Sequence, residues 1–140
     1  MLEKIIYSEL NAKQKEIYNF QKVAALLADY GFNSIKLADD WAGADFLAYH
    51  KDGNQTLKVQ LKGRLTIDKK YVDKDIWMTF PVEDEWYLIP HDDLISIIQT
   101  RTQWMSTDSW NEKGNYNSYA PSKQVVEALK PYRLGVIQRL

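Results

Sequence analysis

The sequence predicts an α/β fold in which helices flank a mixed central β-sheet of four to five strands. Three observations support this prediction: an amphipathic run near the N-terminus, two strand-like runs around a tight turn, and two further strand-like runs that lead into a helix. With 140 residues and 45% hydrophobic content, the chain can bury a core of its own. We therefore expect one domain over residues 1–140, with a core at about 11–100 and a C-terminal extension at about 101–140.

Residues 11–30 have the spacing of an amphipathic helix, and Gly31 is a typical helix stop. The apolar positions are Phe20, Val23, Ala24, Leu27 and Tyr30. Because a helix turns about 100° per residue, Glu16 falls within this apolar face, near the start of the helix. A carboxylate in that position needs a partner. A salt bridge with the neighbouring Lys13 would supply one, and fraying of the helix start would leave the carboxylate in solvent.

Residues 43–49 and 56–64 are expected to form a hairpin, because an Asp-Gly-Asn turn separates two apolar-rich runs. Side chains alternate across a strand, so the second strand places Leu57, Val59 and Leu61 on one face and Lys58, Gln60 and Lys62 on the other. Asp45 on the first strand lies opposite a residue close to position 61. One of the two possible parities brings Asp45 onto the face of Gln60 and Lys62, and only that parity makes a site.

Residues 76–80 and 86–90 are predicted as further strands, each bounded by a proline. A helix over residues 91–99 follows, and Asp92 or Asp93 is placed to cap its N-terminus.

The segment 100–120 is polar, carries scattered aromatic residues and shows no clear period. Long irregular segments in a small domain are often functional, which favours contacts with a ligand here. The alternative is that its aromatic side chains pack on the core or on another subunit; they include Trp104, Trp110 and Tyr116. A last helix is predicted to begin at Pro121 or Ser122 and to run to Leu129.

Two aspartates and two histidines near these elements are expected to have structural roles. Asp39 and Asp40 precede the hairpin in a predicted loop, where aspartate ordinarily helps to form turns. His50 ends a predicted strand and His91 lies beside the start of a predicted helix.

The polar face of the hairpin carries a carboxylate, an amide oxygen and an ammonium group, which together suit phosphoryl chemistry. Oxygen ligands are those that Mg²⁺ prefers, and Mn²⁺ accepts the same ligands. We expect Asp45, Gln60 and the backbone carbonyl of Leu61 to hold such an ion, which would lower the pKa of a bound water molecule. Lys62 would orient that water or stabilise the charge that develops on the phosphate.

These residues resemble the bipartite motif of the PD-(D/E)XK nuclease superfamily, whose members share the restriction-endonuclease-like fold. Asp45, fourteen intervening residues and Gln60-x-Lys62 follow the pattern. The sequence departs from it twice: Ala44 replaces the proline of the motif, and Gln60 replaces the usual Asp or Glu. A neutral amide leaves the site one negative charge poorer. The resemblance covers about residues 11–100.

The resemblance implies a metal-dependent DNA endonuclease of the restriction or homing type. It also implies that Glu16, on the helix before the sheet, supplies a further acid to the metal. Two alternatives keep the same fold: a structure-specific nuclease such as a Holliday-junction resolvase, and a catalytically silent nucleic-acid-binding module. A protein-interaction domain is a third.

DNA binding by this chain would depend on a local basic patch, because the formal net charge is −1. Basic side chains gather in and after the hairpin, and two more lie in the polar tail; the candidates for DNA contacts are Lys58, Arg64, Lys69, Lys70, Arg101 and Lys113. Such contacts to phosphates would weaken with salt. Alternatively, the lysines between 68 and 75 only solvate a loop, since they alternate with aspartates.

Composition sets the expected surroundings. The sequence has no apolar run of the roughly 20 residues that a membrane span needs, and no secretory signal at its start. It contains no cysteine, which fits a reducing compartment. We therefore expect an intracellular, cytoplasmic protein. Since one chain carries one site, cutting both strands of a duplex would need a homodimer or a higher homo-oligomer.

Overall fold

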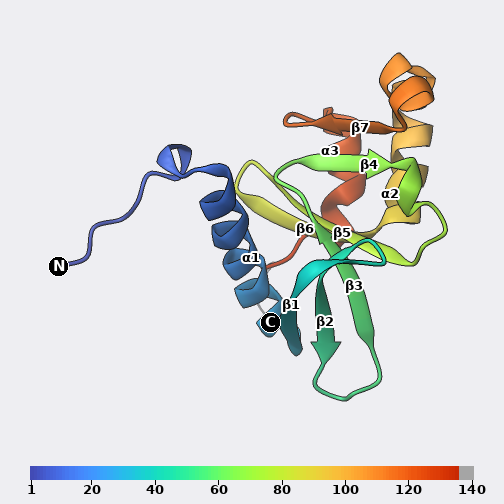
Figure 1. The fold of residues 1–140 in the computed structure, drawn as a ribbon. Helices are drawn as coiled ribbons and strands as arrows, with labels where there is room; N and C mark the ends of the chain where they lie inside the picture. Colours follow the sequence, from blue (N-terminus) through green and yellow to red (C-terminus); the bar gives the residue numbers. More distant parts are fainter. Residues whose placement is uncertain (136–140) are drawn as a thin grey trace, which may run out of the picture.

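A computed structural model of the protein describes residues 1–135 and contains a mixed five-stranded sheet in the order β1-β2-β3-β5-β6 (Figure 1). Neighbouring strands are antiparallel except β3 and β5, which are parallel. The strands are β1 Phe32–Trp41, β2 Ala44–His50, β3 Thr56–Leu61, β5 Ile76–Val82 and β6 Glu85–Pro90. Helices flank this sheet, so the predicted α/β class is confirmed, and the arrangement is consistent with a nuclease-like core.

Helix α1, Ala12–Ala28, covers one face of the sheet (Figure 1). The helix begins at a capping box, in which Asn11 accepts from the Gln14 backbone N–H and Gln14 accepts from that of Asn11. After the helix, Gly31 adopts a φ of 86°, which favours glycine. The core on this face contains Val23, Leu27, Phe46, Ala48, Leu57, Val59, Trp86 and Leu88. The predicted helix and the apolar face of the second hairpin strand are therefore confirmed.

The other face is covered by a small second sheet and two helices (Figure 1). These elements are β4 Leu65–Asp68, β7 Asn115–Ser118, α2 His91–Arg101 and α3 Lys123–Leu129. Short 3₁₀ turns lie at Tyr7–Glu9, Lys69–Tyr71, Trp104–Ser106 and Lys130–Tyr132, and a π-helical turn at Ser109–Lys113. Trp110 is buried in this core, with Trp104 and Tyr116 packed against it. The tail aromatics thus pack on the domain, as the alternative interpretation held.

Several boundaries differ from the prediction. Asp39 and Asp40 lie in strand β1 instead of a loop. The pairing of β1 with β2 shifts register between Lys36 and Trp41, where the strand is irregular. The sequence of β1 lacks a clear alternation of apolar and polar residues, so its strand conformation depends on pairing with β2. A two-residue turn joins these strands, with φ values of 52° at Ala42 and 87° at Gly43, as tight hairpins require.

Two further corrections concern a strand end and a helix cap. Strand β3 ends at Leu61, three residues before the predicted end, although the Lys62 N–H still donates to the Thr79 carbonyl at 3.0 Å. Helix α2 has Pro90 at its N-cap position and no side-chain cap. Asp92 instead accepts from the backbone N–H of Asp73, at 3.2 Å for each carboxylate oxygen.

His91 has a structural role, as expected. Its side chain is buried, and its Nε2 accepts from the Asp68 backbone N–H at 3.1 Å, which joins the start of α2 to the end of β4. Burial lowers the pKa of this imidazole, an effect that the Asp92 carboxylate partly opposes.

Among the described residues, no helix combines the length and the apolar character needed to cross a bilayer.

Candidate active site

The hairpin has the register that places Asp45 and Gln60 together. Phe46 pairs with Val59, so the preceding residue Asp45 lies level with Gln60 on the opposite face of the strands. The Asp45 carboxylate oxygen Oδ2 accepts from the backbone N–H of Leu61 at 2.8 Å. This bond holds the carboxylate across the end of strand β3, beside Gln60.

The side chain of Gln60, beside Asp45, is buried with an oxygen that has no partner among the described residues. Its side chain is only 6% exposed, and its Oε1 atom has no hydrogen-bond donor among the described residues. A buried acceptor without a partner costs about 1–3 kcal/mol of folding free energy. A ligand that bonds to this oxygen would remove that cost, and a cation is one such ligand.

Burial raises the pKa of Asp45. The Leu61 N–H, Lys36 and Lys62 lower it in turn, and Asp40 raises it further. The balance is upward, so the charged carboxylate is incompletely compensated by its protein neighbours. The Lys62 ammonium is thus one of the two lysine charges that act on Asp45.

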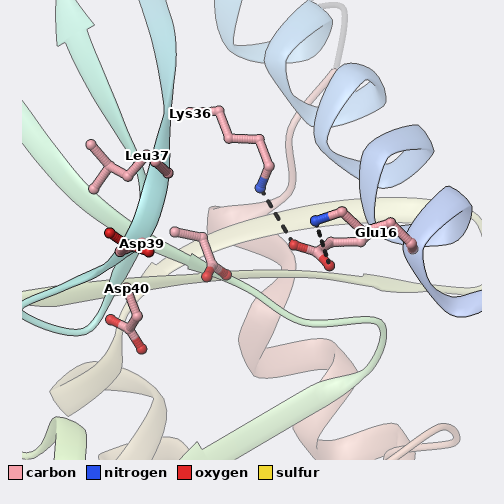
Figure 2. Close-up of a pocket in the computed structure, with 8 residues that line it drawn as sticks. Glu16, Lys36, Leu37, Asp39 and Asp40 are labelled. Atoms are coloured by element: carbon pink, nitrogen blue, oxygen red, sulfur yellow. Dashed lines mark hydrogen bonds and ion pairs between the residues drawn. The ribbon is translucent and has the colours of Figure 1, made fainter.

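A pocket of about 450 Å³ opens beside Asp45, between α1 and the irregular part of β1. Its lining residues are Lys13, Glu16, Lys36, Leu37, Ala38, Asp39, Asp40 and Asp45. Figure 2 shows Lys36 reaching from β1 toward Glu16 on α1, while the Asp40 carboxylate points away from this ion pair.

Glu16 lies in the pocket but is engaged by lysines. Its carboxylate is 3.5 Å from the Lys36 Nζ and 3.9 Å from the Lys13 Nζ. The side chain is 45% exposed, so the prediction that it faces the core is wrong. The reason is that the first turns of α1 are not buried against the sheet. The buried residues of this helix begin at Asn19, one turn after Glu16. A metal could recruit Glu16 only by displacing Lys36.

Sequence reasoning missed Lys36 and gave Asp39 and Asp40 only a turn-forming role. Lys36 and the two aspartates reach the pocket because their strand, β1, pairs with β2, the strand that carries Asp45. The available signal was two adjacent acids one residue before the Ala42–Gly43 turn that leads into Asp45.

The predicted basic residues do not form one continuous patch. Lys58 and Lys70 line a second pocket together with Lys74. Arg64 lies over the ring of Tyr119, with 4.1 Å from its Cζ to the ring centroid, and Lys69 lies over the ring of Trp110 at 5.4 Å. Arg101 lines a separate surface hollow beside Trp104, and Lys113 is the last residue of the π-helical turn.

Asp45 and Gln60 offer the oxygen ligands that a magnesium or manganese ion prefers. The buried Gln60 oxygen lacks a partner and the Asp45 carboxylate is partly desolvated, so both would gain from a hard cation. Within residues 1–135, no three His, Cys, Asp or Glu side chains are grouped to hold a metal by themselves. An amide and a backbone carbonyl would therefore have to complete the ligand set.

Replacing Lys36 with glutamine should tighten Mn²⁺ binding by about three- to tenfold. The substitution removes a cation that pairs with Glu16 and acts on Asp45, so the incoming ion has less repulsion to overcome. Mn²⁺ affinity can be measured from the electron paramagnetic resonance signal of the free ion. Lys13→Gln is the matched control, because Lys13 also pairs with Glu16 but is 71% exposed, and should change the affinity less. Weaker binding by Lys36→Gln would show that Lys36 does not compete with the metal.

Comparison with known proteins gives little further information. No protein-family model matches the chain, and no curated protein matches its sequence. The structure of a bacterial homing endonuclease, I-Ssp6803I, is similar at a TM-score of 0.48 and 18% identity, over 81% of this chain and 78% of that one. A similarity at this level is no basis for assigning an activity. The functional interpretation therefore depends on the geometry of the site.

Proposed function

We propose that this protein is a metal-dependent DNA endonuclease that hydrolyses phosphodiester bonds with Mg²⁺ or Mn²⁺. The observation that carries the proposal is the buried, unpartnered Oε1 of Gln60 level with the Asp45 carboxylate. Buried acceptors in folded proteins are usually hydrogen-bonded, so an unpartnered oxygen in this position supports a ligand here. Oxygen ligands for a metal beside a lysine suit metal-assisted phosphoryl transfer.

The proposed roles follow from the positions of the side chains. Asp45, Gln60 and the Leu61 carbonyl would hold the ion, and Glu16 would join them after leaving Lys36. When bound, the metal would lower the pKa of a water molecule and offset charge on the phosphate. Lys62, whose charge already acts on Asp45, would position the attacking water and stabilise the negative charge that develops on the phosphate.

The proposed substrate is duplex DNA, cut in the manner of a restriction or homing enzyme. With a formal net charge of −1, the chain would contact phosphates through local lysines and arginines. One chain offers one site, so cutting both strands would require a homodimer or a larger symmetric assembly.

A catalytically silent DNA-binding module is the second candidate. Two observations favour it: Asp45 is the single carboxylate of the hairpin motif, and Glu16 is held by Lys36 and Lys13. A structure-specific nuclease would use the same residues and differ only in the DNA that it accepts.

A cleavage assay on plasmid, linear and branched DNA tests the proposal. We expect product with Mg²⁺ or Mn²⁺ and none with a chelator. Lys62→Met should slow cleavage by about a hundredfold while DNA binding persists, because the substitution keeps the length of the side chain and removes its charge. Metal-independent cleavage that survives in Lys62→Met would contradict the assignment. DNA binding without product on any substrate would identify the silent module instead, and a preference for branched DNA would identify a structure-specific nuclease.

A further inference from the structure

A second pocket, of about 440 Å³, lies next to the candidate active site and shares the Asp40 side of β1 with it. Three separate segments build it: the β1–β2 turn, strand β3 and the loop that follows β4. Its lining residues are Asp40, Ala42, Gly43, Lys58, Lys70, Tyr71 and Lys74. Three lysines and one carboxylate make this lining net positive.

Lys58 stands on strand β3, and Lys70 and Lys74 stand on the segment after β4, which is fixed at two points. The Lys58 Nζ donates to the backbone carbonyl of Lys74 at 3.0 Å, and Asp92 accepts from the Asp73 N–H. On either side of Lys74 the backbone is left-handed, with φ values of 57° at Asp73 and 55° at Asp75. Aspartate tolerates this conformation better than most residues. The cationic lining is therefore held in place before a ligand arrives, which lowers the entropy cost of binding.

The positive charge of the pocket is poorly neutralised by the protein. None of the ion pairs among residues 1–135 involves Lys58 or Lys74, and Lys70 lies 4.0 Å from Asp68 while remaining 62% exposed. Tyr71 adds a neutral donor: burial, and then the carboxylates of Asp40, Asp68 and Asp45, raise its pKa, so its hydroxyl keeps its proton. Ammonium groups and a hydroxyl donor in one hollow suit a phosphate oxygen.

We propose that this pocket binds a second backbone phosphate of the DNA strand that is cut, next to the phosphate that reacts at Asp45. The inference rests on the proposed function, because it is the Asp45 site that gives the strand its position. Lys58, Lys70 and Lys74 would hold the phosphate by charge, and Tyr71 would donate a hydrogen bond. The Asp40 carboxylate on the shared side would keep the strand from sliding sideways by repelling a misplaced phosphate.

The first measurement is duplex binding in Ca²⁺ at several salt concentrations, by fluorescence anisotropy. We expect Lys58→Gln, Lys70→Gln and Lys74→Gln each to raise Kd by about fivefold. Each should reduce the slope of log K against log salt by at most about one, because the three lysines hold a single phosphate. Lys22→Gln is the matched control, because Lys22 lies on α1, over the opposite face of the sheet, and should leave both quantities unchanged. Lys58→Gln also removes the bond that anchors the loop, whereas Lys70→Gln leaves that bond in place. A weaker Kd in Lys70→Gln therefore cannot be explained by loss of the anchor.

The second measurement locates the phosphate. Single neutral methylphosphonates are placed in turn along the strand around the cut site. One position flanking the scissile bond should weaken binding of the native protein and have no further effect on the Lys58→Gln and Lys74→Gln double variant. Equal penalties in both proteins, or pocket variants that behave like Lys22→Gln, would overturn the phosphate site while leaving the nuclease proposal intact. If the native protein cleaves no DNA but binding still depends on the pocket lysines, the result would count against the nuclease while leaving a phosphate site in this pocket.

Discussion

Replacing Asp45 with asparagine should reduce DNA cleavage by about a hundred- to a thousandfold without unfolding the protein. Asparagine keeps an oxygen that can accept from the Leu61 N–H, so the end of the hairpin stays in place. It removes the single carboxylate of the hairpin motif and with it the strongest proposed metal ligand. The rate should be measured at saturating Mg²⁺ on the DNA that the native protein cuts best.

Thermal unfolding at several pH values gives an independent reading of the same variant. The folded-state pKa of Asp45 is raised above its ordinary value of 3.8, so the native fold binds this proton more tightly than the unfolded chain does. The resulting stability is present below pH 3.8 and is lost as pH rises through the folded pKa. In a chelator at neutral pH, Asp45→Asn should therefore have a Tm equal to or above that of the native protein.

Metal should reverse that order. Mg²⁺ should raise the Tm of the native protein at neutral pH, because it binds the folded state alone, and it should raise the Tm of Asp45→Asn much less. Near-native cleavage by Asp45→Asn, or an equal Tm gain on adding Mg²⁺, would remove Asp45 from the metal site.

Replacing Gln60 with methionine should raise stability and lower activity together. Methionine has a similar volume and shape, and it removes the buried oxygen that lacks a donor. We expect the free energy of unfolding to rise by about 1 kcal/mol in the absence of metal. We expect cleavage to fall by about a hundredfold, because a metal ligand is lost. A structural role for Gln60 predicts the opposite change in stability, which chemical denaturation would detect.

Gln60→Glu separates the two properties further, since it restores the acid usual in the PD-(D/E)XK motif. A second carboxylate level with Asp45 should lower Tm at neutral pH in a chelator, because two like charges share a partly buried site. Adding Mg²⁺ or lowering the pH should restore the Tm. Tighter Mn²⁺ binding than in the native protein should accompany the change, and unchanged Mn²⁺ affinity would place Gln60 outside the ligand set.

The elements that the sequence predicted well carry their signal locally. Helix α1 follows from its 3.6-residue apolar period and the β2–β3 hairpin from its Asp-Gly-Asn turn. Strands β5 and β6 follow from runs of aromatic and β-branched residues. Strands β1, β4 and β7 have weaker patterns, and each is completed by pairing with another segment. Strand β7 pairs with β4 across almost fifty residues of sequence, which no local pattern can indicate.

The candidate site divides in the same way. The residue types of the hairpin were readable because strand alternation alone puts Gln60 and Lys62 on one face. The engagement of Glu16 by Lys36, and the role of Asp39 and Asp40 in the pocket, were not readable, because both depend on how β1 lies between α1 and β2. Which charged side chains of distant segments form an ion pair depends on how the segments pack, and spacing along the chain does not indicate it.

The sequence by itself determined the α/β class, the hairpin and the set of oxygen and ammonium groups that the hairpin carries. Only the tertiary structure decided which parity brought Asp45 level with Gln60, that the Gln60 oxygen is buried without a donor, and that three lysines surround a second pocket. The physical reason is range. Alternation and turn geometry act over a few residues, whereas burial, ion pairing and pocket shape are set by segments that meet only when the sheet and its helices pack together.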